Sequence, residues 1–233
     1  MANEKVAVIT GASHGIGLSL VAAYRQAGYN VVANALSIGA STDPSVINVA
    51  GDIGDPATAD RIMSEGAEKF GRLDTLVNDA GIFIAKPFTE YTQADYDAML
   101  STNLAGFFHL TQRAMRVMEP QGRGHIVNFI ATSAEQPVSG APALLSSLTK
   151  GGLSAATKAL AIEYGPRGIR VNAVSLGIIQ TQSGSYAGLE KLNALRRLGQ
   201  IADVVNAVMY LEKAEYVSGE ISHVDGGQSA GHW

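Results

Sequence analysis

The sequence predicts a single α/β domain in which a parallel β-sheet is covered by helices on both faces. Short apolar runs of strand length alternate along the chain with longer segments of helical spacing, which is typical of this class. The chain has 233 residues, 46% of them hydrophobic, enough for one large core. Neither a repeat nor a Pro/Ser-rich linker divides it. We therefore expect one domain over residues 1–233.

The elements follow from the apolar runs and the turns between them. The first strand is expected at 6–10, and a glycine-rich turn leads into a helix at 16–27 that Gly28 ends. The other expected strands are 31–35, 46–50, 75–77, 124–130, 169–174 and 220–224. The other expected helices are 57–70, 94–118 and 143–164. The apolar face of the 94–118 helix includes Met99, Leu100, Leu104, Phe107, Phe108 and Leu110. A segment at about 183–193 has no clear period and is interpreted as a substrate lid.

The composition excludes several classes of function. A net charge of −4 with interspersed signs gives no surface suited to nucleic acid or an anionic membrane. The chain has no cysteine, and its five histidines lack the spacing of a metal site. No serine lies in the GxSxG turn of a hydrolase. The start of the chain has no long apolar stretch, so the cytoplasm is the expected compartment.

The turn at residues 10–17 is suited to binding phosphate. It reads Thr-Gly-Ala-Ser-His-Gly-Ile-Gly, directly between the first strand and the first helix. Glycines allow a tight turn and a close approach of the backbone, and the helix N-terminus offers unpaired N–H groups and a partial positive charge. In this context the pattern favours a dinucleotide site over a ligand-free turn.

The TGxxxGxG spacing resembles that of the short-chain dehydrogenase/reductase family, and further motifs agree in the same order. They are Asp52 after the third strand, Asn78-Asp79-Ala80-Gly81 after the fourth, Asn103, Ser133, Lys150, the segment 169–175 and Val224-Asp225-Gly226-Gly227. The resemblance covers about residues 5–230. It implies a doubly wound, three-layer Rossmann-like fold with seven parallel strands in the order 3-2-1-4-5-6-7. It also implies a homo-oligomer, a dimer or tetramer, and a small carbonyl or alcohol as substrate.

The resemblance implies which residues of this chain contact the cofactor. They are Gly11, Ser13, His14, Gly15, Ile16, Gly17, Asn34, Ser37, Asp52, Ile53, Asn78, Ala80, Gly81, Lys150, Gly177, Ile179 and Thr181. Discrimination between NAD and NADP rests on the end of the second strand, where a carboxylate selects NAD. Here the strand ends in Asn34-Ala35-Leu36-Ser37, with neither an acid nor a base. The missing carboxylate favours NADP, and NAD stays open.

The resemblance also implies a catalytic set of Ser133, Asn103, Lys150 and a tyrosine four residues before the lysine. That tyrosine would exchange the proton, and the lysine would lower its pKa. Counting from Ser133 and from Lys150 leads to the same position, which is Ser146. Serine is a shorter and much weaker acid, so the proton relay is expected to be weakened or altered. The Lys150 ammonium could replace it, directly or through water, and Tyr186 in the lid is another candidate.

Two alternatives remain open at this point. The chain could be a cofactor-binding pseudoenzyme, acting as a sensor or structural subunit, or its active site could be engineered or repurposed. Three further departures from the family pattern lie near the cofactor: Asp79 replaces an asparagine, Leu176 a proline, and Gln182 a common proline. The negative charge of Asp79 would favour an oxidised, cationic nicotinamide.

Overall fold

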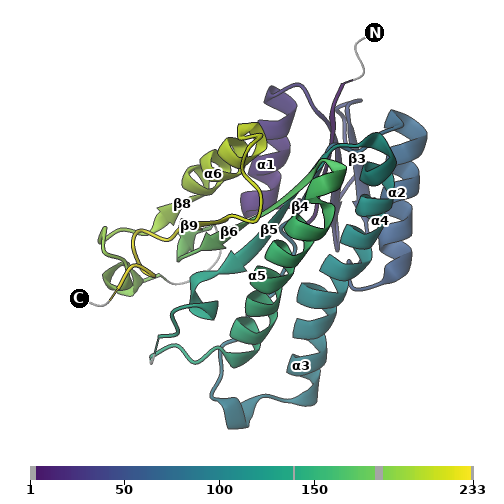
Figure 1. Cartoon of the computed structure of the whole chain (residues 1–233). Coiled ribbons are helices and arrows are strands. Elements are labelled where there is room, and N and C mark those ends of the chain that lie inside the picture. Colours follow the sequence, from purple (N-terminus) through teal and green to yellow (C-terminus); the bar gives the residue numbers. More distant parts are fainter. Residues whose placement is uncertain (1–3, 139, 182–185, 232–233) are drawn as a thin grey trace.

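A parallel sheet of seven strands forms the centre of the protein in a computed structural model, which describes residues 4–138, 140–181 and 186–231 (Figure 1). Its order is β3-β2-β1-β4-β5-β6-β9. The strands are β1 (Val6–Ile9), β2 (Asn30–Ala35), β3 (Val46–Ala50), β4 (Thr75–Asn78), β5 (Gly124–Ala131), β6 (Ile169–Leu176) and β9 (Ile221–Val224). All paired neighbours run parallel. The predicted fold class and strand order are confirmed.

Helices cover both faces of this sheet. The helices are α1 (Gly15–Gln26), α2 (Pro56–Phe70), α3 (Gln93–Leu100), α4 (Gly106–Gln121), α5 (Leu144–Tyr164) and α6 (Ile201–Lys213). Apolar side chains of α2, α4 and α5, among them Ile62, Leu110 and Ala161, form one core with the sheet. Leu20 of α1 and Val204 of α6 belong to a second core on the other face. Because the strands are parallel, their carboxyl ends lie together at one end of the sheet, where the first glycine turn also lies.

The helix expected at 94–118 is broken by an irregular turn. A π-helical segment, Ser101–Ala105, separates α3 from α4 and contains Asn103. Phe108 was placed on the apolar face, yet 56% of it is exposed, because the inward face of α4 is formed by Leu110, Ala114 and Met118. Single π-turns inside helices often mark functional positions, which fits the presence of Asn103 here.

Two elements were not expected from the sequence. One is α6, whose buried residues Val204, Val208 and Leu211 do have helical spacing. The other is a two-stranded parallel sheet of β7 (Ile179–Gln180) and β8 (Gly199–Gln200). This small sheet fixes both ends of the segment that includes the expected lid. Of that lid, residues 183–185 lie outside the described residues, as does Gln182, and Leu189–Leu192 forms a 3₁₀ turn.

Candidate functional site

The glycine turn adopts the conformation that its sequence predicts. Gly11 and Gly15 have φ angles of 69° and 56°, which side chains other than glycine rarely adopt. Gly17 packs so closely that an added Cβ would lie 2.4 Å from the carbonyl oxygen of Gly11. His14 occupies the N-cap position of α1 without a capping side-chain bond, so the turn leaves backbone donors of the helix available.

A pocket of about 570 Å³ opens above this turn at the carboxyl ends of β1–β4. Most of the expected cofactor contacts line it: Gly11, Ser13, His14, Gly15, Ile16, Asn34, Ser37, Asp52, Ile53, Ala80, Gly81 and Thr181. Residues that were not on that list also line it, namely Ala35, Leu36, Gly51, Asp79, Ile82 and Thr102. The residues expected to contact the cofactor thus come from five segments of the chain and line a single pocket.

Asn34 and Asp52 shape the edge of the pocket at the ends of β2 and β3. The Asn34 amide donates to the carbonyl oxygens of Val49 (2.9 Å) and Gly51 (3.2 Å), so it ties β2 to the turn after β3. Asp52 Oδ1 accepts the N–H of Gly54 at 2.9 Å. Ser37 lines this pocket and also an adjoining hollow between α1 and the 36–48 segment. The pocket therefore continues past the end of β2, where no carboxylate faces it from positions 34–37.

The segment after β4 is held to β1 by Thr10. Its hydroxyl accepts the N–H groups of Asp79 (3.1 Å) and Ala80 (2.9 Å). The Asn78 side chain points inward and donates to Thr111 and Asn128, so its role is to anchor the segment. Gly81 lies against the lysine of α5, because an added Cβ would be 3.1 Å from Lys150 Nζ.

The Asn103 side chain holds the segment after β4 in place. Its Oδ1 accepts the N–H of Ile82 at 2.9 Å, and its Nδ2 donates to the Ile82 carbonyl at 3.0 Å and to Thr149 Oγ1 at 3.2 Å. Asn103 therefore joins the π-turn, the segment after β4 and α5. Sequence reasoning missed Thr149, although it lies one residue before Lys150 and three after Ser146.

Ser133, Ser146 and Lys150 come together where β5 ends and α5 begins. Ser133 lies in a 3₁₀ turn, Thr132–Ala134. Its carbonyl oxygen accepts a hydrogen bond from the Ser147 hydroxyl at 2.9 Å. The Ser133 hydroxyl oxygen is buried and has no hydrogen-bond partner among the described residues. Ser146, only 2% exposed, lies in the first turn of α5. Lys150 Nζ donates to the Phe129 carbonyl at 2.8 Å.

Two titratable groups of the site are shifted toward neutrality. Burial lowers the pKa of Lys150 to about 8, against the opposing charge of Asp79. Burial also raises the pKa of Asp79 to about 7, although the Lys150 charge and a hydrogen bond from the Gly17 N–H act in the other direction. Both groups can therefore gain or lose a proton near physiological pH.

The loop after β6 reaches the pocket at Thr181. Gly177 is required there, since an added Cβ would lie 2.6 Å from Asp225 Cα. Ile179 is buried in β7, and Leu176, which stands at the family's proline, ends β6. The Tyr186 hydroxyl bonds Thr181 at its N–H (3.0 Å) and its Oγ1 (2.8 Å). The phenol thus lies at Thr181, the expected nicotinamide contact.

The features of the pocket fit a nicotinamide dinucleotide. A glycine cradle at a helix N-terminus suits the pyrophosphate, and the buried Ser133 hydroxyl, which has no hydrogen-bond partner among the described residues, has hydrogen-bonding capacity left for a ligand. Within the described ranges, no group of three His, Cys, Asp or Glu side chains could hold a metal ion. Likewise, none of the helices described is long and apolar enough to cross a membrane.

Comparison with known proteins agrees with this geometry. The family described as enoyl-(acyl carrier protein) reductase matches residues 11–229. A 3-oxoacyl-(acyl-carrier-protein) reductase of Thermotoga maritima is 31% identical over 246 residues, covering 96% of this chain and 97% of the relative. The solved structure of ElxO with NADP bound is 27% identical, with a TM-score of 0.90 over 98% of this chain and 100% of that one. A 3-ketoacyl-(acyl-carrier-protein) reductase from Brucella melitensis, complexed with NADH, is 28% identical, with the same TM-score and coverages.

These matches extend over almost the whole chain and include the segments that build the pocket. The glycine turn, the segment after β4 and the Ser133–Lys150 region all lie within the matched residues. The chain therefore belongs to the short-chain dehydrogenase/reductase family of oxidoreductases.

Proposed function

We propose that the protein is an NAD(P)-dependent oxidoreductase acting on a small carbonyl or alcohol, with a proton relay in which Lys150 replaces the usual tyrosine. The observation that carries this proposal is that Lys150, whose pKa is lowered to about 8, lies near the start of α5, which is hydrogen-bonded to the turn that holds the partnerless Ser133 hydroxyl. When bound, the nicotinamide supplies or accepts the hydride. Ser133 would hold the substrate oxygen, and the Lys150 ammonium would donate its proton to that oxygen in the reducing direction.

The cofactor is proposed to be NADP, with NAD as the alternative. The structural relatives include one with NADP and one with NADH bound, so relatives of this fold use both. Positions 34–37 offer no carboxylate to the ribose hydroxyls, and the hollow beyond Ser37 leaves room for an additional phosphate. Ser13 and Ser37 border both hollows and would supply hydroxyl donors there.

A first prediction concerns Lys150. Lys150→Ala is expected to lower carbonyl reduction at saturating NADPH by about 10² or more, because the proton donor is lost. In the unmodified protein the same rate should fall as the pH rises above about 8, when the ammonium deprotonates. Stopped-flow measurement of NADPH oxidation gives both results.

Lys158→Ala is the matched control for this prediction, because Lys158 is exposed on the same helix. It should keep full activity. Cofactor affinity is measured separately by fluorescence titration, so that a binding defect is not mistaken for a catalytic one. Hydride transfer that is unchanged in Lys150→Ala at saturating cofactor contradicts the assigned role.

A pseudoenzyme is the second candidate, favoured by two observations. Serine occupies the position of the proton donor, and the Tyr186 hydroxyl already bonds the N–H and hydroxyl of Thr181. Tight cofactor binding without turnover on a panel of carbonyls and alcohols would favour this candidate. Turnover on any of them excludes it.

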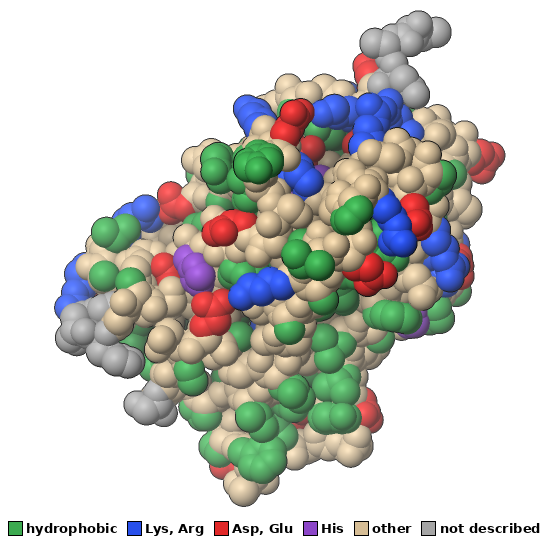
Figure 2. All heavy atoms as spheres, viewed as in Figure 1, with side chains coloured by type: hydrophobic (Ala, Val, Ile, Leu, Met, Phe, Trp, Pro, Cys, Tyr) green, Lys and Arg blue, Asp and Glu red, His purple; other side chains and the backbone are tan. Residues whose placement is uncertain are grey.

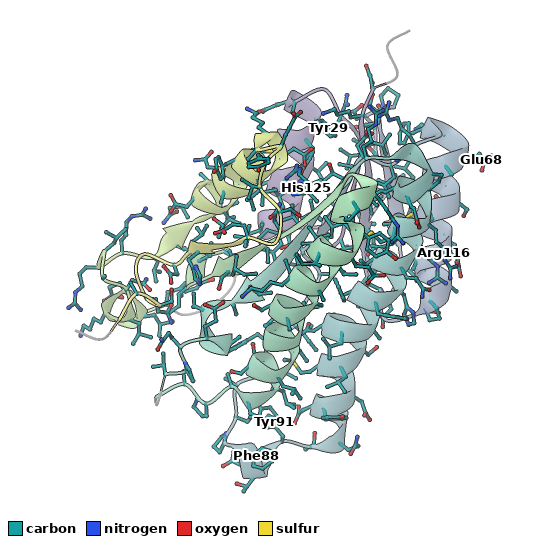
Figure 3. All side chains as sticks on the ribbon, viewed as in Figure 1. Tyr29, Glu68, Phe88, Tyr91, Arg116 and His125 are labelled. Atoms are coloured by element: carbon teal, nitrogen blue, oxygen red, sulfur yellow. The ribbon has the colours of Figure 1, made fainter. Side chains whose placement is uncertain are left out.

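We also propose that the protein forms a homo-oligomer, a dimer or tetramer, through α4, α5 and the edge strand β9. Phe108, Leu148 and Ile162 on these helices are 56%, 54% and 82% exposed. Figure 2 shows hydrophobic side chains gathered at the lower end of the displayed face, where Figure 3 places Phe88 and Tyr91. Light scattering is expected to give two or four times the chain mass of 24.3 kDa, and Phe108→Glu to lower it. A monomer at micromolar concentration contradicts this proposal.

A further inference from the structure

The most unusual group in the pocket is the carboxyl of Asp79, which lies against the glycine turn. A Cβ added to Gly11 would be 2.9 Å from Asp79 Oδ2, and one added to Gly17 would be 2.8 Å from the same oxygen. The backbone N–H of Gly17 donates to this carboxyl. Asp79 is therefore held to the turn by its position after β4, which Thr10 fixes.

This placement sets the carboxyl against a bound dinucleotide. Gly17 is in the first turn of α1, whose unpaired N–H groups and partial positive charge are the features that bind an anion. An ionised Asp79 takes one of these donors and brings a negative charge to the lining of the same pocket. The pyrophosphate of a nicotinamide dinucleotide is also negative, so the two charges repel each other in a partly desolvated site.

The other charged or titratable groups that face this position come from three segments. They are Lys150 of α5, His14 of the glycine turn and Asp52 after β3. Of these, Lys150 favours the ionised form of Asp79, whereas burial disfavours it more strongly and raises its pKa to about 7. The neutral acid is therefore accessible near pH 7 in the absence of any ligand.

We propose that cofactor binding is coupled to protonation of Asp79, so that the dinucleotide binds the form of the protein in which this side chain is a neutral carboxylic acid. The coupling rests on the proposed function, since it requires a dinucleotide in this pocket. The pyrophosphate charge stabilises the neutral acid further, so binding above neutral pH takes up a proton from solution. Affinity then falls by at most tenfold per pH unit above about pH 7, the limit for one linked proton.

The test is calorimetric titration of the full-length protein with NADP⁺ and NADPH between pH 6 and 8, in two buffers of different ionisation enthalpy. The unmodified protein is expected to take up between 0.5 and about one proton per cofactor at pH 7.5 to 8, in line with one linked site. Asp79→Asn keeps the shape and the acceptor for the Gly17 N–H but cannot ionise. It should bind more tightly than the unmodified protein at pH 8, by roughly three- to tenfold, with little change between pH 6 and 7.5.

The pKa of Lys150 is about 8, so loss of its positive charge near that pH weakens cofactor binding to both the unmodified protein and Asp79→Asn. The deciding quantity is therefore the difference between the affinities of these two proteins at each pH. Asp97→Asn, which removes an exposed carboxylate from α3, controls for net charge and should keep the pH dependence of the unmodified protein. Absence of proton uptake, or an Asp79→Asn variant that keeps the original pH dependence, overturns the coupling. If Asp79→Asn does not fold, the proton uptake of the unmodified protein at pH 7 decides, because Lys150 is still mostly protonated there and about half a proton per cofactor is expected from Asp79. Absence of cofactor binding at every pH in every variant instead refutes the proposed function.

Discussion

Replacing Ser146 with tyrosine is expected to raise carbonyl reduction at saturating cofactor by about 10² to 10⁴, the usual contribution of a positioned acid or base. A phenol has a reference pKa of about 10, far closer to neutrality than that of a serine hydroxyl, and the positive charge of Lys150 lowers it further. The two positions are four residues apart on α5 and lie on one helix face. The variant should therefore add the tyrosine proton donor of the family pattern to a site in which we propose that Lys150 alone supplies the proton.

The surroundings of position 146 decide whether the phenol can act there. Ser146 is 2% exposed, so a larger side chain at this position must displace its neighbours. Ser146→Phe makes the same steric demand without a hydroxyl and is the matched control. Ser147→Tyr is a second control, since Ser147 is directed to the Ser133 carbonyl instead.

The measurement is the single-turnover rate of NADPH oxidation, with cofactor affinity determined in parallel. Ser146→Tyr should increase the rate and leave affinity within about threefold, whereas Ser146→Phe should not increase it. An equal gain in the phenylalanine variant would mean that filling the space, not proton donation, limits the reaction. No gain in a folded tyrosine variant that binds cofactor would show that the relay does not limit turnover.

The fold was predictable because strand and helix signals alternate along this chain without interruption. Each strand pairs with its neighbours through main-chain bonds, so the order follows once the family pattern is recognised. The helix α6 shows the limit of the approach. Val204, Val208 and Leu211 have the spacing of a buried face, yet the helix comes directly after the two-residue strand β8 and its N-cap is Gln200 instead of the usual Ser, Thr, Asp or Asn.

Most of the residues that line the pocket follow from the sequence, but the hydrogen bonds that their side chains form do not. Asn34, Asn78 and Asn103 were all expected to act on ligands, yet the amide of each is bonded to main chain or side chains of distant segments. Such partners are 15 to 50 positions away in the sequence and become neighbours only through the fold. Asp79 was recognised as a departure from the family pattern, but its contact with the glycine turn depends on the same long-range geometry.

At the amino ends of the strands, Glu212→Ala is expected to destabilise the protein by about 3 to 5 kcal/mol, as for other buried charge networks that lose one member. The Glu212 carboxylate accepts hydrogen bonds from Tyr24, Tyr29, Thr75 and His125, all within 3.1 Å. Figure 3 shows Tyr29 and His125 near one another, at the end of the molecule away from Phe88. Removal of the carboxylate leaves four buried donors without their acceptor.

The hydrogen-bond network also assigns the protonation of its members. Asn172 Nδ2 donates to His125 Nε2 at 3.1 Å, so Nδ1 carries the proton that is donated to Glu212. Burial lowers the pKa of His125, which keeps the ring neutral. Burial alone would raise the pKa of Glu212, but the hydrogen bonds from His125, Tyr29 and Thr75 outweigh it and hold the pKa below its ordinary value of 4.5.

These shifts give the stability a defined pH dependence. A carboxyl whose pKa is lower in the folded than in the unfolded state stabilises fully above its ordinary pKa of 4.5 and loses this contribution as the pH falls toward about 2. The neutral His125 acts in the same direction, because the unfolded chain binds its proton first, below the ordinary value of 6.5. Unfolding free energy should therefore decrease from about pH 6.5 downward, and most steeply below 4.5.

Urea unfolding between pH 3 and 7 tests this dependence. Glu212→Gln retains one acceptor oxygen, so its loss at pH 7 should be smaller than that of the alanine variant, and its difference from the unmodified protein should shrink below pH 4.5. Glu215→Ala, at an exposed position just beyond the same helix, should change stability by no more than about 0.5 kcal/mol. A difference between Glu212→Gln and the unmodified protein that stays constant from pH 7 to 3 would mean that the carboxylate contributes through its shape and not through its charge. Cofactor affinity should be the same in all folded variants, since the network lies at the amino ends of the strands and the pocket at their carboxyl ends.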